Sequence, residues 1–201
     1  MSSGNKIPKA AVITIPVILI FAVAAYIVIQ RAEKSRSDLP VYGTVPEFQF
    51  TSQHGEPFGT GDLMGKINIM DFFFTSCRGP CPVMHTNMSD LYELFKGHEQ
   101  IQFVSISVDP ENDTPEVLAG YARDFKVNDG RWVFLHAPID SVVWLSENGF
   151  SLAADNLPNM HSTKFVLVDE NAQIRGYYSG TDEASINIMI THIREMVKSL
   201  K

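Results

Sequence analysis

From residue 47 to the end of the chain, short apolar runs alternate with longer segments of helical spacing. The strands are expected at 47–50, 66–74, 101–108, 131–135, 164–168 and 173–178, and the helices at 80–95, 115–125, 140–148 and 182–201. This alternation, closed by a hairpin through 169–172 and a last helix, favours a mixed sheet covered by helices. The sequence therefore predicts an α/β fold.

Polar and turn residues mark several element boundaries. His54-Gly55 supplies a turn after the first strand, so a hairpin is expected to open the domain. Thr114 precedes Pro115, which is the usual order of a helix cap and a first helical residue. Gly149 is expected to close the helix at 140–148, and Thr181 or Asp182 is expected to cap the last helix.

Near the N-terminus, residues 10–29 contain no charged side chain. A helix of that length spans roughly 30 Å, the thickness of a bilayer core. We therefore predict residues 1–9 as a short N-terminal segment, 10–30 as a transmembrane anchor, 31–46 as a linker, and 47–201 as the folded domain. A cleaved signal peptide is the main alternative, with a cleavage site at 22–24, although its apolar region is normally shorter.

The charge balance excludes one class of partner. The chain has 16 Lys and Arg against 23 Asp and Glu, and removing the first 36 residues, which hold five of the basic and one of the acidic side chains, leaves a net charge of −11. A nucleic-acid-binding protein needs a basic surface instead. The domain is expected to attract a cationic partner. Basic residues flank the apolar segment on both sides, so charge alone leaves its orientation open.

The only two cysteines stand where a buried strand meets a helix. Cys77 and Cys81 enclose Arg78, Gly79 and Pro80. A helix N-terminus and a neighbouring arginine both favour the thiolate, which is the form that binds soft metals and attacks disulfides. A structural disulfide is the alternative, yet so short a loop constrains the unfolded chain little. The pair therefore predicts metal binding or thiol–disulfide chemistry.

Three motifs together resemble the Sco/SenC family over residues 44–200. They are Cys77-x-x-x-Cys81-Pro82, then Val108-Asp109-Pro110 followed by Asp113-Thr114-Pro115, then His161-Ser162 before Phe165-x-Leu167-x-Asp169. The resemblance implies a membrane-anchored, thioredoxin-like protein that holds Cu(I) or Cu(II) with Cys77, Cys81 and His161. Two thiolates and an imidazole form a soft donor set that suits copper.

The resemblance also implies a cellular role. Family members deliver copper to the binuclear copper centre of cytochrome c oxidase or maintain its cysteines. The implied partners are the copper-centre subunit of the oxidase and a copper donor or thiol-reductant protein. The implied location is the bacterial inner membrane, with the domain on the extracytoplasmic side and residues 1–9 as a short cytoplasmic N-terminus.

One residue departs from the family pattern. Many members carry an aspartate immediately before the histidine, where this chain has Met160. The change removes a carboxylate that would orient the imidazole, and it offers either a thioether ligand or core packing instead. His85, four residues after Cys81, is a weaker second candidate ligand, whereas Met84 and Met88 have the spacing of core residues.

Two other functions fit the cysteine pair. Asp71 lies six residues before Cys77, the spacing at which thioredoxins hold a buried aspartate behind their cysteines. Such a carboxyl exchanges protons with a buried thiol, so a thiol–disulfide oxidoreductase with Asp71 as proton relay is the second hypothesis. A thiol peroxidase ranks third, because it needs a helping Thr and Arg beside one cysteine.

Overall fold

The central strand of the domain is β4 (Ile67–Phe73). The structure is a computed structural model that describes residues 19–20, 22–26, 39–154, 156–158 and 161–200. All seven residues of β4 are buried, as expected for an apolar strand covered on both faces. It pairs in parallel with β5 (Ile101–Ser107) and antiparallel with β7 (Lys164–Val168). The mixed sheet predicted from the sequence is confirmed.

The remaining strands extend this sheet on both sides. They are β1 (Gly43–Thr44), β2 (Gln49–Ser52), β3 (Pro57–Gly59), β6 (Trp132–His136) and β8 (Gln173–Ser179). Within the described residues the strand order is β1-β8-β7-β4-β5-β6-β2-β3. The hairpins predicted near each end of the domain are the antiparallel pairs β2–β3 and β7–β8.

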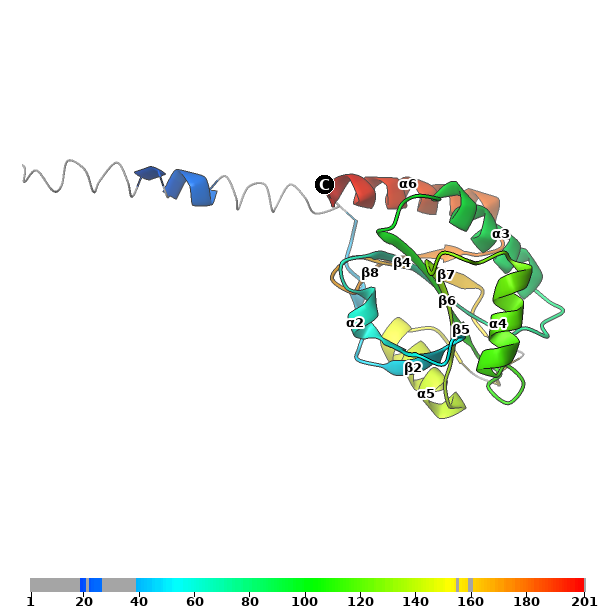
Figure 1. Cartoon of the computed structure of the whole chain (residues 1–201). Helices are drawn as coiled ribbons and strands as arrows, with labels where there is room; N and C mark the ends of the chain where they lie inside the picture. The colour runs from blue at the N-terminus through cyan, green and yellow to red at the C-terminus, as the bar shows by residue number, and fades with distance from the viewer. Residues whose placement is uncertain (1–18, 21, 27–38, 155, 159–160, 201) are drawn as a thin grey trace, which may run out of the picture. The chain divides into compact units, whose positions relative to one another are not determined.

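Helical segments cover both faces of the sheet. They are α2 (Thr60–Leu63), α3 (Cys81–Leu94), α4 (Pro115–Asp124), α5 (Ile139–Trp144), the single wide turn η1 (Leu145–Gly149) and α6 (Glu183–Ser199). Neighbouring residues of β4 face opposite ways: the Phe72 ring packs on Phe150 beyond η1, whereas the Phe73 ring packs on His85 of α3 and Tyr121 of α4. Figure 1 shows α3 and α6 together on one side of the sheet.

The predicted helix caps are largely confirmed. The Thr114 hydroxyl accepts a hydrogen bond from the Val117 amide at 3.4 Å, and the Asp182 carboxylate accepts one from the Ser185 amide at 2.8 Å. Gly149 has a different role from the one expected. A Cβ at this position would lie 2.8 Å from the Leu145 side chain and 3.1 Å from the Pro46 ring. Close packing therefore requires the glycine, and the last helical turn before it widens to η1.

The segment from Leu39 to Val45, assigned to a linker by its sequence, is part of the folded unit. The Tyr42 amide donates to the Ile174 carbonyl at 2.9 Å, and the Val45 amide donates to the Ala172 carbonyl at 2.8 Å. These bonds, with the pairing of β1 to β8, make the segment the edge of the sheet next to β8. Its Pro and Gly content hides this pairing from pattern analysis, because an edge strand needs few apolar residues.

Most of the expected anchor at 10–30 lies outside the described residues, which include only 19–20 and 22–26 of it. Those residues are helical. Within the part of the chain that the structure describes, no helix combines the length and the apolar character needed to cross a bilayer.

Candidate metal centre

The topology of the sheet brings together three residues that are up to 84 positions apart. Cys77 lies in the loop after β4, Cys81 is the first residue of α3, and His161 precedes β7. Because β4 and β7 are antiparallel, with Met70 opposite Val166, the end of β4 and the start of β7 meet at the same edge. The histidine is therefore delivered to the cysteine pair by strand pairing.

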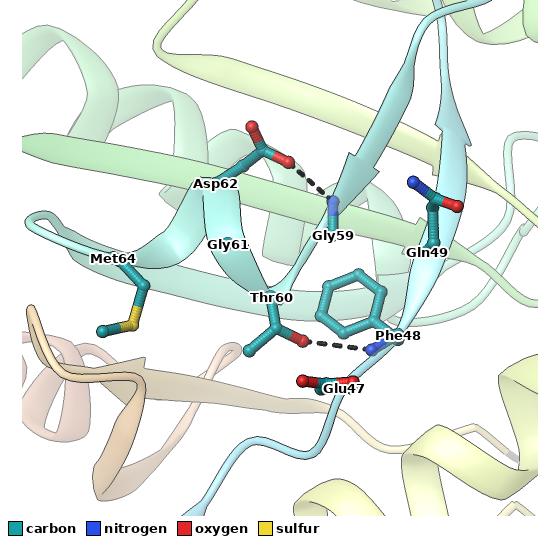
Figure 2. Close-up of a pocket in the computed structure, with 8 residues that line it drawn as sticks. All are labelled: Glu47, Phe48, Gln49, Gly59, Thr60, Gly61, Asp62 and Met64. Carbon is teal, nitrogen blue, oxygen red and sulfur yellow. Dashed lines mark hydrogen bonds between the residues drawn. The ribbon is translucent and has the colours of Figure 1, made fainter.

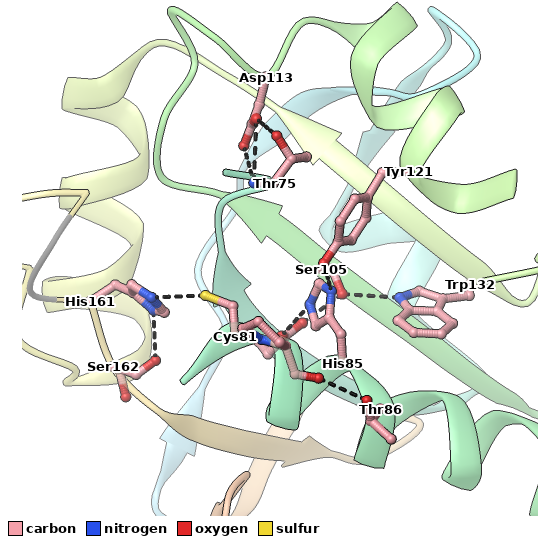
Figure 3. A network of polar contacts seen from close by, with 12 residues as sticks. Thr75, Cys81, His85, Thr86, Ser105, Asp113, Tyr121, Trp132, His161 and Ser162 are labelled. Atoms are coloured by element: carbon pink, nitrogen blue, oxygen red, sulfur yellow. Dashed lines mark hydrogen bonds and ion pairs between the residues drawn. The ribbon is translucent and has the colours of Figure 1, made fainter. Parts of the chain in front are cut away.

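The three side chains form a compact donor set. One sulfur from each cysteine and one nitrogen of His161 all lie within 4.8 Å of one another. The Cys81 Sγ is 3.2 Å from His161 Nε2. Figure 3 shows the two side chains directed toward each other. Both cysteines carry free thiols; Cys81 is buried, whereas Cys77 and His161 are half-buried. Among the described residues this is the one such group of His, Cys and acidic side chains.

The hydrogen bonds of His161 determine which ring nitrogen is available. Its Nδ1 lies 3.0 Å from the backbone carbonyl of Ser162. A carbonyl only accepts, so Nδ1 carries the proton and Nε2 presents its lone pair to the cysteines. Burial lowers the pKa of His161, which keeps the imidazole neutral and ready to bind a metal. The Ser162 carbonyl thus performs the orienting role for which the sequence offered no carboxylate, and Met160 itself lies outside the described residues.

The electrostatics of Cys81 differ from the sequence-based expectation. Burial is the largest cause that raises the pKa of the Cys81 thiol above its usual range, and the neighbouring Cys77 raises it further. Desolvation therefore outweighs the helix N-terminus at this residue. In the metal-free protein the Cys81 thiol keeps its proton, and a bound cation is needed to stabilise the thiolate.

The loop that carries Cys77 is held by a buried carboxylate. Asp113 is fully buried; it accepts a hydrogen bond from the Thr75 amide at 3.1 Å, one from the Thr75 hydroxyl, and one from the Ser107 hydroxyl at 2.6 Å. Thr114 caps α4, and the Asp113 carboxylate instead fixes the loop after β4. Since Thr75 is engaged here and Arg78 is exposed, the geometry does not favour a peroxidase arrangement.

Asp71 and His85 lie next to each other behind this centre. The Asp71 carboxylate is fully buried, 3.1 Å from His85 Nε2 and 2.6 Å from the Ser105 hydroxyl. His85 Nδ1 lies 2.9 Å from the Tyr121 hydroxyl, so both ring nitrogens are occupied. His85, the weaker candidate ligand, is therefore not part of the donor set among the described residues. Met84 and Met88 are fully buried core residues, as predicted.

A surface pocket elsewhere lacks comparable donors. It lies beside β2, β3 and α2 and is lined by Glu47, Phe48, Gln49, Gly59, Thr60, Gly61, Asp62 and Met64 (Figure 2). The Asp62 carboxylate already accepts the Gly59 amide at 2.8 Å, and the Thr60 hydroxyl accepts the Phe48 amide at 3.1 Å. These polar groups stabilise the α2 turn, so the cysteine centre remains the candidate site.

The lowered pKa of His161 predicts a pH dependence of stability in the metal-free protein. The unfolded chain takes up this proton at a higher pH than the folded chain, so the stabilisation is fully present above the unfolded pKa and is lost as the pH falls through the folded value. The urea concentration at the unfolding midpoint should therefore decline as the pH is lowered from 8 to 5. In His161→Gln this midpoint should depend less on pH. Equal slopes in His161→Gln and in the wild-type protein would contradict this, and the exposed His98→Gln serves as control.

Comparison with known proteins identifies the family to which the chain belongs. The sequence model of the SCO1/SenC family matches residues 39–198. A SCO1/SenC family lipoprotein from Bacillus anthracis is 34% identical with a TM-score of 0.74, and the match covers 81% of this chain and 99% of that one. BsSco, a Sco-family cytochrome c oxidase assembly protein with a disulfide switch, is 25% identical with a TM-score of 0.68, over 81% and 98% of the two chains.

A third structure shares the fold at lower identity. ScoI of Bradyrhizobium japonicum, solved with copper bound, is 21% identical with a TM-score of 0.63, over 74% of this chain and 99% of that one. The sheet and helices are thus those of thioredoxin-like Sco structures, as the sequence predicted. With the family model matching from Leu39 almost to the end, and with both cysteines and the histidine meeting at one edge of the sheet, the chain belongs to the SCO1/SenC family.

Proposed function

We propose that this protein is a copper metallochaperone that holds one copper ion, as Cu(I) or Cu(II), with Cys77, Cys81 and His161. The observation that carries the proposal is the convergence of two sulfurs and one imidazole nitrogen within 4.8 Å. His161 Nε2 faces the Cys81 sulfur with its lone pair free, because the proton of the imidazole is on Nδ1, which donates to the Ser162 carbonyl. When bound, the ion would be cargo held for transfer.

The donor types favour copper over other metals. Structural zinc sites use four protein ligands, and calcium or magnesium sites use oxygen. Two thiolates and one imidazole instead suit a soft ion of low coordination number. The half-buried position of Cys77 leaves the cargo accessible to a receiving protein.

The proposed destination is the binuclear copper centre of cytochrome c oxidase, and the proposed partners are its copper-centre subunit and a copper donor or thiol reductant. Support comes from BsSco, which is described as an oxidase assembly protein. We place the domain on the extracytoplasmic side of a bacterial inner membrane, anchored through residues 10–30. The apolar segment and the lipoprotein nature of the Bacillus anthracis relative support this placement.

Copper titration of the reduced full chain, purified in detergent, tests the proposal. We expect binding to saturate at one copper per chain. With Cu(II), a thiolate-to-copper charge-transfer band should grow until one equivalent has been added. A titration without saturable binding, or a copper complex without thiolate charge transfer, would overturn the assignment.

A second function is favoured by the two free thiols and by the half-buried position of Cys77. We propose that the pair also reduces a partner disulfide. The half-buried Cys77 thiolate attacks the partner, forming a mixed disulfide and releasing one partner thiolate; Cys81 then attacks the Cys77 sulfur and releases the second. Two electrons pass to the partner, and the Cys81 proton goes to Asp71, whose charge is among the causes that raise the pKa of Cys81.

Asp71→Asn tests the proton-relay role. We expect the variant to slow reduction of a disulfide substrate at least about tenfold, because the amide cannot accept the Cys81 proton. Stopped-flow exchange kinetics with metal-free protein would measure the rate. Asp90→Asn, which changes an exposed acid on α3, the helix that carries Cys81, is the control, and wild-type kinetics in Asp71→Asn would remove Asp71 from the mechanism.

A further inference from the structure

A second polar network lies directly behind the cysteine pair, in the core between β4, α3 and α4. Its centre is the contact of Asp71 with His85, both without any exposed surface. Tyr121 contacts the other nitrogen of His85, and Ser105 contacts the other oxygen of Asp71. Figure 3 shows Cys81 directed toward His161, while His85 on the same helix points to Tyr121 and the core.

The hydrogen bonds of this network have one consistent direction. Trp132 Nε1 lies 2.9 Å from the Ser105 hydroxyl, and an indole nitrogen only donates. Ser105 therefore accepts from Trp132 and donates its own proton to Asp71 Oδ1. The other oxygen, Oδ2, takes the N–H of His85. Each donor and acceptor along the network has a partner, which is the condition for keeping such groups in a core.

The His85 imidazole is also fixed by its aromatic surroundings. The centre of its ring lies between 4.5 and 6.2 Å from the centres of five rings, those of Phe73, Tyr121, Phe125, Trp132 and Phe134. In a close-packed interior such neighbours leave no second rotamer for the ring. The His85 ring therefore keeps one orientation, with Nε2 directed at Asp71 Oδ2.

The hydrogen bond between Asp71 and His85 connects the two elements that position the cysteines. Asp71 belongs to β4, the strand that leads into the Cys77 loop, and His85 lies four residues after Cys81 on the buried face of α3. The bond thus joins the two elements that carry the two cysteines. We propose that Asp71 and His85 are positioning residues that set where the Cys81 sulfur stands relative to the Cys77 sulfur. The inference rests on the proposed function of the cysteine centre.

Two isosteric variants separate the contacts of His85. In His85→Gln the amide nitrogen reaches the place of Nε2 and keeps the bond to Asp71. In His85→Asn the shorter amide reaches only the place of Nδ1, so the bond to Tyr121 is kept and the bond to Asp71 is lost. Both substitutions keep a polar side chain of similar character at the same position.

The first measurement needs no metal. We expect the equilibrium constant for closing the Cys77–Cys81 disulfide in a glutathione buffer, in the full chain in detergent, to fall at least about tenfold in His85→Asn. We expect it to stay within about threefold of the wild-type value in His85→Gln. Copper affinity should follow the same order in the two variants.

A control variant distinguishes positioning from loss of stability. Leu91→Ala removes a buried side chain from the same helix, and Leu91 has no part in the network. The inference is overturned if His85→Asn matches the wild type, if His85→Gln shifts as far as His85→Asn, or if Leu91→Ala gives the same shift. Should the wild-type chain not bind copper, the proposed metallochaperone function fails, while the glutathione equilibrium still decides the positioning role.

Discussion

Cys81→Ser and His161→Ala should each weaken copper binding at least about a hundredfold. Serine places a hard hydroxyl, protonated at neutral pH, where the structure has a buried sulfur 3.2 Å from His161 Nε2. Alanine removes the nitrogen whose lone pair faces both thiols. With either change, two of the three donors remain, and the bound copper must complete its coordination with water.

The affinities are measured by competition with a Cu(I) chelator on reduced full-length protein. Ser76→Ala and His98→Ala are suitable controls, because both residues are exposed and neither belongs to the donor set. Their affinities should equal that of the wild type. If Cys81→Ser and His161→Ala also retained wild-type affinity, copper would be bound elsewhere in the chain and the centre would be wrongly assigned.

His85→Leu should lower the free energy of unfolding by about 3–5 kcal/mol, because the substitution leaves the Asp71 carboxylate buried without its partner. The Asp71 side chain has no exposed surface, so water cannot replace the lost donor. The Tyr121 hydroxyl loses its partner at the same time. Guanidinium unfolding of the reduced, metal-free chain measures the change.

The double variant Asp71→Val/His85→Leu provides the internal control. Replacing both members of a buried pair by apolar side chains is often close to neutral, so the double variant should recover most of the loss seen in His85→Leu. A double variant less stable than His85→Leu would show that the pair contributes little beyond the packing of its two side chains.

The positions of the strands and helices along the chain could be predicted because they depend on local sequence patterns. The apolar run of β4, the helical spacing of α3 and the Thr114-Pro115 cap depend on neighbours within a few residues. The exceptions were features that depend on distant contacts. The segment at 39–45 becomes ordered by pairing with β8, and Gly149 is needed because Pro46 packs against it.

The candidate site was only partly accessible from the sequence. The spacing of Cys77 and Cys81 at a strand–helix junction indicated their chemistry, whereas His161 was identified through the family resemblance. Asp113 and Ser162 belong to the family motifs, but nothing in the sequence shows how either residue acts. Asp113 reaches Thr75 across 38 residues, and Ser162 acts through a backbone carbonyl, a group that every residue possesses.

By itself, the sequence determined the order of strands and helices, the acidic character of the domain and the chemistry open to the cysteine pair, because each follows from side-chain chemistry or short-range periodicity. Tertiary structure alone decided how the donors are used. Burial raises the pKa of Cys81, the Ser162 carbonyl selects the free nitrogen of His161, and Asp71 engages His85, which is not part of the donor set. Desolvation and hydrogen-bond direction depend on the complete set of neighbours, which only the folded chain assembles.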